Sequence, residues 1–357
     1  MCTNHRNAIQ CIIPPYIADK MIDNEETKTD EALDNQLRDH RFRSDRKFFS
    51  ALTKPQQIRM AVKKISATKP KPIIEVYTCA HGYSLPGKLV AGKSMTTSKD
   101  KDVKNVYHGV KYTSEFYYKI FNRNSIDNAG MALINSVHYG NRYNNAMWNG
   151  RQMVFGDGDK TTFGSFTADL DIMGHELTHG VTQFTANLDY ENQSGALNES
   201  FSDVFGIMIK QFALNLDVNQ SNWLIGENVM RGKQYALRSM KAPGSAYKNH
   251  PLLGNDPQPA TMDNYQKLPN TDAGDYGGVH YNSGIPNYAF CMAAIEVGGY
   301  AWETVGKVWY AALTQILKHN ADFTAAKKAT IDRAQKLFGK KSKVRQAVIN
   351  GWVKAKV

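Results

Sequence analysis

The chain has 357 residues, of which 42% are hydrophobic and 11% aromatic, so it is long enough for two or three domains with packed cores. No stretch approaches the roughly 20 apolar residues of a membrane-spanning helix, which excludes such a span. The net charge of +11 suits acidic partners. The lysines and arginines gather in residues 38–71 and 327–356 without interleaved aromatics, so we interpret them as solvated helix faces and expect no nucleic-acid partner.

Residues 1–71 have the pattern of a separate N-terminal unit. The sequence CIIPPY at residues 11–16 looks extended and precedes an acidic stretch at residues 19–39. A basic helical pattern follows and ends in KPKP at residues 69–72, which predicts a linker. Residues 1–6 lack the apolar core of a secretory signal, so we expect secretion by a route without a classical signal peptide, with a cytoplasmic location as the alternative.

The four cysteines have the spacing of neither a metal knuckle nor a disulfide scaffold, so we expect reduced, independent thiols: Cys2, Cys11, Cys79 and Cys291. Cys291 stands in the apolar run at residues 289–294, which predicts a buried packing residue.

The rest of the chain divides into a β-rich part, residues 72–190, and a helical part, residues 191–357. Strand-like runs at residues 73–77 and 153–155 flank an aromatic-rich helical pattern at residues 106–121. A long helix carrying His175 and His179 closes the first part. Helical patterns in the second part cover residues 196–213, 283–297, 301–317, 325–337 and 343–353. The fold class that this order predicts is α+β.

Residues 175–179 read HELTH and predict a metal site. On a helix, positions i and i+4 lie on one face about 6 Å apart along the axis, so one zinc ion can take both His175 and His179. Glu176, between them, is placed to act on water at the metal. Glu199, 20 residues after His179, can be the third protein ligand. Three protein ligands and one open position are typical of a catalytic zinc site.

The position of Asp203 is evidence that this pattern did not arise by chance. The pattern H-E-x-x-H alone is expected in roughly one chain in a hundred of this length. Asp203 lies one helical turn after Glu199, where it can accept the outer ring N–H of a zinc-bound histidine and fix its tautomer.

The segment from residue 171 to 203 resembles the active-site segment of the thermolysin family of zinc endopeptidases. Four further blocks resemble family segments and follow in the family's order: NNAMWNG at residues 144–150, GDGD at 156–159, ALRSM at 236–240 and DYGGVHYNSG at 275–284. The resemblance covers roughly residues 73–357. It implies two lobes, β-rich and helical, with the zinc helix at the floor of a cleft between them.

The resemblance also implies the chemistry. Zinc and Glu176 would activate the attacking water, and zinc, Tyr190 and His280 would stabilise the oxyanion. Asp275 would orient His280 and keep it cationic. We therefore expect a metalloendopeptidase, a monomer that acts on proteins or peptides.

Further residues are assigned to substrate binding by the resemblance. Asn145 and the Ala146 backbone would hold the substrate main chain, with Trp148 on the same strand, and Arg238 would bind a substrate carbonyl in a bidentate manner. Five residues would line the pocket for the residue after the scissile bond and favour large apolar side chains there: Phe163, Phe166, Ile172, Val229 and Leu237. Plain core packing remains an alternative for each of the five.

The short N-terminal unit resembles the prosegment of the protealysin-like subgroup of this family. It implies an inhibitory segment, removed by cleavage near residues 65–73; a permanent N-terminal arm is the alternative. Cys11 could place its sulfur at the open zinc position, since thiolates bind zinc well. Alternatively, Pro14, Pro15 and Tyr16 could fill a substrate pocket, or Cys11 could merely pack.

This sequence departs from the family's pattern at the double calcium site. Asp171 and Glu227 remain, but Lys210, Asn222 and Leu224 stand where further carboxylates are expected. A buried lysine would neutralise the two carboxylates, so we expect the double site to be absent or weakened. A single calcium site elsewhere stays open, because calcium accepts backbone and amide oxygens.

Two other functional classes compete with the peptidase. A catalytically dead binding protein could retain the fold, but all ligands and proposed catalytic groups are present. A basic binder of nucleic acid or membrane surfaces would show strongly salt-dependent binding that zinc chelation does not affect.

Overall fold

The computed structural model describes residues 10–24, 29–30, 32–39, 73–92, 98–232 and 235–357. The linker expected at residues 69–72, the cleavage region and most of the basic helical pattern before it lie outside these residues. In the described ranges, no helix combines the length and apolar character needed to cross a membrane.

Six strands form one mixed sheet in the order β1-β5-β6-β4-β2-β3. The strands are β1 Gln10–Cys11, β2 Ile74–Thr78, β3 Lys88–Ala91, β4 Leu133–Val137, β5 Ala146–Trp148 and β6 Met153–Phe155. Strand β4 is parallel to β2 and β6, and the other pairs are antiparallel. The N-terminal unit therefore supplies a strand to this sheet, because Cys11 pairs with Met147 of β5.

The first half of the fold and the junction between the halves include the helices α1 Pro15–Asp23, α3 Lys101–Phe121, α4 Leu170–Gln183 and α5 Asn192–Leu214. Helix α3 starts before the predicted residue 106 because the Asp100 carboxylate caps it, accepting from the N–H groups of Asp102 and Val103. The prediction of an extended run at residues 11–16 is wrong at its end. Pro15 begins α1, where its missing N–H removes no helical hydrogen bond.

The C-terminal half is mainly helical, as predicted. It contains α6 Asp275–Asn282, α7 Gly284–Val297, α8 Val305–Gln315, α9 Phe323–Phe338 and α10 Lys343–Lys354, with 3₁₀ turns at Met262–Asn264 and Ala301–Glu303 and a hairpin of β7 Leu224–Ile225 and β8 Arg238–Ser239. The helix predicted at residues 301–317 is split, because Thr304 has a non-helical backbone.

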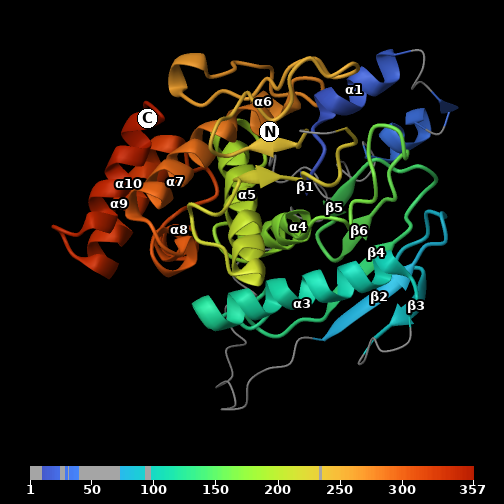
Figure 1. Ribbon diagram of the computed structural model, residues 1–357, viewed down its shortest axis with the longest axis horizontal. Helices are drawn as coiled ribbons and strands as arrows, with labels where there is room; N and C mark the ends of the chain where they lie inside the picture. Colours follow the sequence, from blue (N-terminus) through green and yellow to red (C-terminus); the bar gives the residue numbers. More distant parts are fainter. Residues whose placement is uncertain (1–9, 25–28, 31, 40–72, 93–97, 233–234) are drawn as a thin grey trace, which may run out of the picture.

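Helix α4 lies at the centre of the molecule (Figure 1), packed against α5, α3, β1 and β5. Two glycines let α4 and α5 approach closely. A Cβ at Gly174 would lie 3.0 Å from the Gly206 Cα, and one at Gly206 would lie 2.5 Å from the Asp171 carbonyl oxygen. The approach sets α5 side chains directly against the histidines of α4. The α+β class, with a β-rich first part and a helical second part, is confirmed.

Candidate metal centre and the strand that crosses it

The side chains of His175 and His179 on α4 converge with that of Glu199 on α5. Their Nε2 atoms lie 3.0 Å apart, and the Glu199 carboxylate oxygens lie 3.4 Å from His175 Nε2 and 3.5 Å from His179 Nε2. Metal–ligand bonds of about 2.0–2.2 Å would place tetrahedral ligands at similar separations. All three side chains are buried. The geometry thus suits a single ion coordinated by the three residues predicted as ligands.

Both histidines are held at their outer ring nitrogens. His175 Nδ1 lies 2.8 Å from Asp203 Oδ1, the partner that the sequence predicted. His179 Nδ1 lies 3.0 Å from Asn198 Oδ1 and 2.9 Å from Ser202 Oγ. Each ring therefore turns its Nε2 toward the centre. The sequence does not predict the roles of Asn198 and Ser202, although they directly precede Glu199 and Asp203 on the same helix.

The electrostatics of the cluster favour a positive charge. Burial alone would lower the pKa of His175, but Asp203 and Glu199 outweigh it and raise that pKa to about 9. Burial would likewise raise the pKa of Glu199, yet His280, His179 and His175 hold it well below its usual value. The carboxylate is therefore ionised and available to a cation.

Glu176 points toward the strand β5 side of the centre. Its Oε2 accepts the Trp148 backbone N–H at 2.8 Å, while Oε1 is buried and has no hydrogen-bond partner within the described parts of the chain. Burial raises the pKa of Glu176 to about 8, despite the lowering effect of His175. Such a carboxyl can exchange a proton near neutral pH.

Tyr190 and His280 lie together on the opposite side. The Tyr190 hydroxyl donates to Glu199 Oε1 and lies 3.1 Å from His280 Nε2. Asp275 holds His280 twice, with Oδ1 2.5 Å from Nδ1 and Oδ2 2.7 Å from the backbone nitrogen. Burial lowers the pKa of His280, but Asp275 and Glu199 outweigh it and raise that pKa. The arrangement provides two hydrogen-bond donors beside the centre.

The glycines before His280 allow this arrangement. Residues 275–278 all have positive φ, between 50° and 85°. At Gly277 a Cβ would lie 2.3 Å from Asn192 Oδ1, so only glycine fits this left-handed turn. The turn directs Asp275 back onto the His280 ring.

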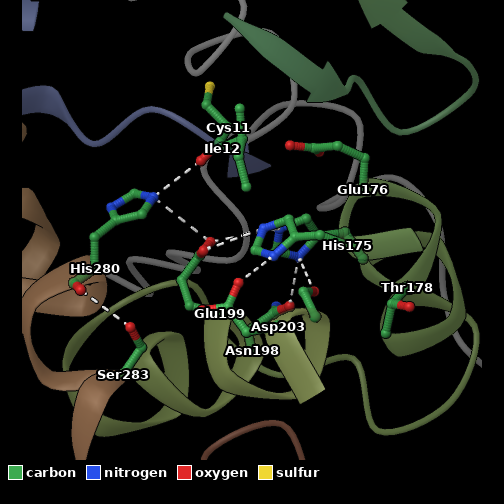
Figure 2. Close-up of polar contacts among 12 residues, drawn as sticks. Cys11, Ile12, His175, Glu176, Thr178, Asn198, Glu199, Asp203, His280 and Ser283 are labelled. Atoms are coloured by element: carbon green, nitrogen blue, oxygen red, sulfur yellow. Dashed lines mark hydrogen bonds and ion pairs between the residues drawn. The ribbon is translucent and has the colours of Figure 1, made fainter. Parts of the chain in front are cut away.

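The N-terminal segment runs through the candidate site (Figure 2). His280 Nε2 lies 3.1 Å from the Cys11 carbonyl oxygen. Ile12 donates its N–H to the Ala146 carbonyl at 3.1 Å, and its own carbonyl accepts from Arg238 Nη1 at 3.0 Å. The Ile13 N–H donates to Asn145 Oδ1 at 3.1 Å. The residues predicted to hold a substrate main chain therefore hold this segment.

Arg238 differs from its prediction in one respect. Its bidentate contact is with Asp203, through Nε and Nη2 at 2.8 Å each, and only Nη1 reaches a main-chain carbonyl. Asp203 thereby links Arg238 to His175. Arg238 and His175 outweigh the effect of burial and lower the pKa of Asp203 to about 2.

The Cys11 side chain packs away from the centre. It is buried in a small cluster of side chains that includes Tyr139, Tyr143, Met147 and Val154. Figure 2 shows its sulfur pointing away from His175 and Glu199. Of the alternatives for Cys11, the structure therefore favours packing over zinc ligation. Pro14 and Pro15 are buried where α1 begins, and the Tyr16 ring lies 4.3 Å from the Tyr281 ring, between centroids.

The five residues predicted to line a substrate pocket are buried in the main apolar core, to which Ile12 also belongs: Phe163, Phe166, Ile172, Val229 and Leu237. The Phe163 and Phe166 rings are 5.8 Å apart. Cys291 is also buried, as predicted.

Lys210 lies between the carboxylates of Asp171 and Glu227, at the position of the family's double calcium site. Its Nζ lies 2.9 Å from Asp171 Oδ2 and 2.5 Å from Glu227 Oε1, and Asn222 Nδ2 donates to Glu227 Oε2 at 2.6 Å. An ammonium group at these distances fills the space between the carboxylates. The residues do not fit a calcium pair.

Comparison with known proteins gives consistent matches. A family profile described as "Thermolysin metallopeptidase, catalytic domain" matches residues 48–183, and one described as "Thermolysin metallopeptidase, alpha-helical domain" matches residues 186–357. The precursor of protealysin, a metalloproteinase from Serratia proteamaculans, superposes with a TM-score of 0.84 at 41% identity, covering 98% of this chain and 99% of its own.

Two curated relatives show similar identities. Protease PrtS of Photorhabdus sp. (strain Az29) is 46% identical over 280 residues, 78% of this chain and 74% of its own length. The extracellular metalloprotease of Pectobacterium carotovorum subsp. carotovorum is 50% identical over 257 residues, 71% of this chain and 73% of its own length.

Proposed function

Since this chain belongs to the thermolysin family of metallopeptidases, we propose that it is a zinc-dependent neutral endopeptidase, made as a precursor that its own N-terminal segment inhibits. The observation that carries the proposal is the path of residues 11–13. They cross the candidate site, and the Cys11 carbonyl, the Ile12 N–H and carbonyl and the Ile13 N–H contact partners expected for a substrate.

Zinc fits the donor set of His175, His179 and Glu199. Two imidazoles and one carboxylate are typical ligands of a catalytic zinc ion and leave a position open. Glu199 Oε2 is buried and, among the described residues, has no hydrogen-bond partner, as expected of an oxygen that a metal would use. When bound, zinc supplies a Lewis acid that polarises the scissile carbonyl and acidifies water.

The chain's own groups then move the proton and stabilise charge. Glu176 takes the proton of the attacking water and passes it to the leaving amine. In this proposal the Cys11 carbonyl oxygen, 3.1 Å from His280 Nε2, stands in for the scissile carbonyl oxygen of a substrate. Tyr190 and His280 would donate to that oxygen as it gains negative charge, and Asp275 keeps His280 oriented and cationic.

In this proposal Ile12 takes the position after the scissile bond. Ile12 follows the carbonyl that faces His280, and its side chain is 0% exposed and belongs to the main apolar core, as do Phe163 and Leu237. A buried β-branched side chain here supports a preference for large apolar residues after the scissile bond.

Several contacts outside the strand hold the segment in place. Asn35 Nδ2 donates to the Asn141 carbonyl at 3.0 Å, and Lys20 Nζ to the Leu253 carbonyl at 2.5 Å. Asp39 accepts from Asn145 Nδ2 at 3.1 Å, so Asn145 is held by the N-terminal unit at both ends of its amide. While these contacts persist, a substrate strand cannot reach β5.

Residues 1–71 are therefore proposed as the removable inhibitory segment, with cleavage near residues 65–73, of which residues 65–72 lie outside the described part of the chain. Residues 72–190 and 191–357 would form the two catalytic lobes. Because the relative from Pectobacterium is named as extracellular, we propose that this enzyme is secreted. We also propose that Lys210 replaces the family's double calcium site.

Intact mass against time tests the proposal directly. Zinc-loaded full-length protein is compared with Glu176→Gln, a variant of equal size that lacks the base. Only the active protein should lose about 70 N-terminal residues. If both remain intact, self-processing is wrong, and a peptide with a large apolar residue after the scissile bond, offered after limited proteolysis, tests the peptidase itself. If both are cut alike, another protease does the processing.

A further inference from the structure

Three polar residues meet at one edge of the sheet, at the carboxyl ends of neighbouring parallel strands. His81 follows β2, His138 follows β4 directly and Asp157 follows β6. Strand β4 is parallel to both β2 and β6, so the three chain segments leave the sheet on the same side. This edge of parallel strands is where α/β proteins commonly bind ligands.

The ligand atoms of the three residues already lie close together. His138 Nδ1 is 2.9 Å from both Asp157 carboxylate oxygens, and His81 Nδ1 is 3.5 Å from Asp157 Oδ2. One atom from each residue lies within 4.8 Å of the others. A tetrahedral ion with bonds of about 2.0–2.2 Å needs ligand separations near 3.4 Å, so small side-chain movements would suffice.

His138 is prepared for coordination from its far side. Its Nε2 lies 2.9 Å from Asp100 Oδ2, and the other Asp100 oxygen caps helix α3. A carboxylate on one imidazole nitrogen fixes the tautomer that leaves the other nitrogen as a metal ligand. The same carboxylate–histidine pairing occurs at His175 and Asp203 in the candidate zinc centre.

The backbone fixes the two histidines relative to each other. The His81 N–H donates to the His138 carbonyl at 2.8 Å, and both residues have positive φ, 64° and 53°. Asp157 is buried at the base of the cluster, while the His81 side chain is 59% exposed. The solvent side is therefore open to an entering ion and to water as a fourth ligand.

We propose that His81, His138 and Asp157 form a second metal site, specific for a borderline divalent ion such as Zn²⁺, Co²⁺ or Ni²⁺. Two imidazoles with one carboxylate suit these metals better than Ca²⁺ or Mg²⁺, which take oxygen ligands. The ion would tie together the ends of β2, β4 and β6 and, through Asp100, the start of α3.

A proton is the competitor of the metal. Asp157 is the main cause that raises the pKa of His138 to about 9, with Asp100 adding to it against the effect of burial. Within the described part of the chain, the charged and titratable groups near His138 include Asp157, Asp100, Asp102 and His81. Binding must displace the proton on Nδ1, so it should tighten as the pH rises toward 9.

The test counts metal ions on the full-length chain. Glu176→Gln protein, which should not digest itself, is dialysed at pH 8 against micromolar free Zn²⁺, and bound zinc is measured by elemental analysis. We expect two ions per chain in this parent and one after the additional change His81→Asn. Asparagine tolerates the left-handed backbone of His81, so the loop should keep its shape.

Two further variants make the result specific. Asp100→Asn keeps a good helix cap but removes the carboxylate behind His138, and should weaken the second ion roughly 10–100-fold. His108→Asn, which removes an exposed histidine elsewhere, should keep both ions. The proposal fails if His81→Asn binds as many ions as its parent, or if His108→Asn loses as many. The test compares the number of bound ions in each variant with the number in the parent. If the centre at His175 binds no zinc, the total is lower by one in the parent and in every variant, so that failure is seen separately.

Discussion

Helices α4 and α5 build two buried clusters of charge, and the two clusters are neutralised in different ways. At one end of α4, Asp171 meets the ammonium of Lys210 from α5, at 2.9 Å. Further along, His175 and His179 meet Glu199, with distances that suit an ion between them. The same pair of helices thus presents one site filled by a side chain and one site shaped for a metal.

The oxygen atoms of the two clusters show the difference. Asp171 uses both oxygens, since Oδ1 accepts the Gly226 N–H at 3.1 Å and Oδ2 contacts Lys210. In the other cluster, Glu199 Oε2 and Glu176 Oε1 are buried and lack hydrogen-bond partners within the described residues. A cluster that supplies its own cation is complete as folded, whereas one with unsatisfied oxygens still has a ligand to bind.

Removal of zinc should give the largest contrast between the two clusters. A zinc chelator should abolish peptide hydrolysis by the mature enzyme, and added zinc should restore it, because the metal polarises the reacting carbonyl. A calcium-selective chelator should change neither activity nor Tm, since Lys210 is part of the chain. Activity and thermal unfolding, measured with each chelator, check both statements. A drop in Tm on calcium removal would reveal a calcium site, and an equal drop in Lys210→Met would place that site away from Lys210.

Glu176→Gln should separate metal binding from catalysis. The amide oxygen can still accept the Trp148 N–H, so the side chain should stay in place. Without a base, kcat/KM should fall roughly 10²–10⁴-fold while zinc content stays at the parent level. Peptide kinetics and elemental analysis on the same sample measure the two effects. Activity close to the parent value would remove Glu176 from the mechanism.

Lys210→Met should show how much the other cluster depends on its internal cation. The change leaves Asp171 buried without its partner, which typically lowers the free energy of unfolding by about 3–5 kcal/mol. Denaturant unfolding of the Glu176→Gln protein with and without the change gives the value. Lys336→Met, in an exposed pair with Asp332, is the matched control and should stay within about 0.5 kcal/mol of the parent.

Lys210→Glu should convert the filled cluster into one that needs a metal. With Asp171 and Glu227 it would place three carboxylates together, a set of oxygens that calcium prefers. At a hundredfold excess over Kd, calcium should raise the Tm of this variant by roughly 3–8 °C, with little effect on the parent. Thermal scans with calcium and with magnesium provide the comparison. An equal response of the parent would mean that calcium binds elsewhere.

The sequence predicted the pairs whose members lie one helical turn apart. His175 and His179 form such a pair on α4, and Glu199 and Asp203 form one on α5. That the second pair faces the first depends on how the two helices cross. The ion pairs of Lys210 could be predicted too, because a lysine among carboxylates neutralises their charge. Asn198 and Ser202 could not, since their contacts with His179 depend on how α5 crosses α4. The crossing is set by the close approach at Gly174 and Gly206.

The N-terminal segment shows a second limit of sequence reasoning. The sequence drew attention to Cys11 and to Pro14, Pro15 and Tyr16, yet the residue whose main chain contacts both Ala146 and Arg238 is Ile12. In a strand, neighbouring side chains face opposite sides, so one step of register exchanges Cys11 for Ile12. The pairing of Cys11 with Met147 fixes that register, and composition alone does not reveal it.

Strand β1 stands at the end of the sheet order, beside β5. Its departure would leave β5 as an edge, with backbone donors and acceptors facing outward, and such edges can recruit other chains and promote aggregation. The proposed precursor would therefore be protected from self-association as well as held inactive. After maturation, each bound substrate would complete the sheet for the lifetime of the complex, so a saturated enzyme should aggregate more slowly than an idle one, a difference that light scattering can follow.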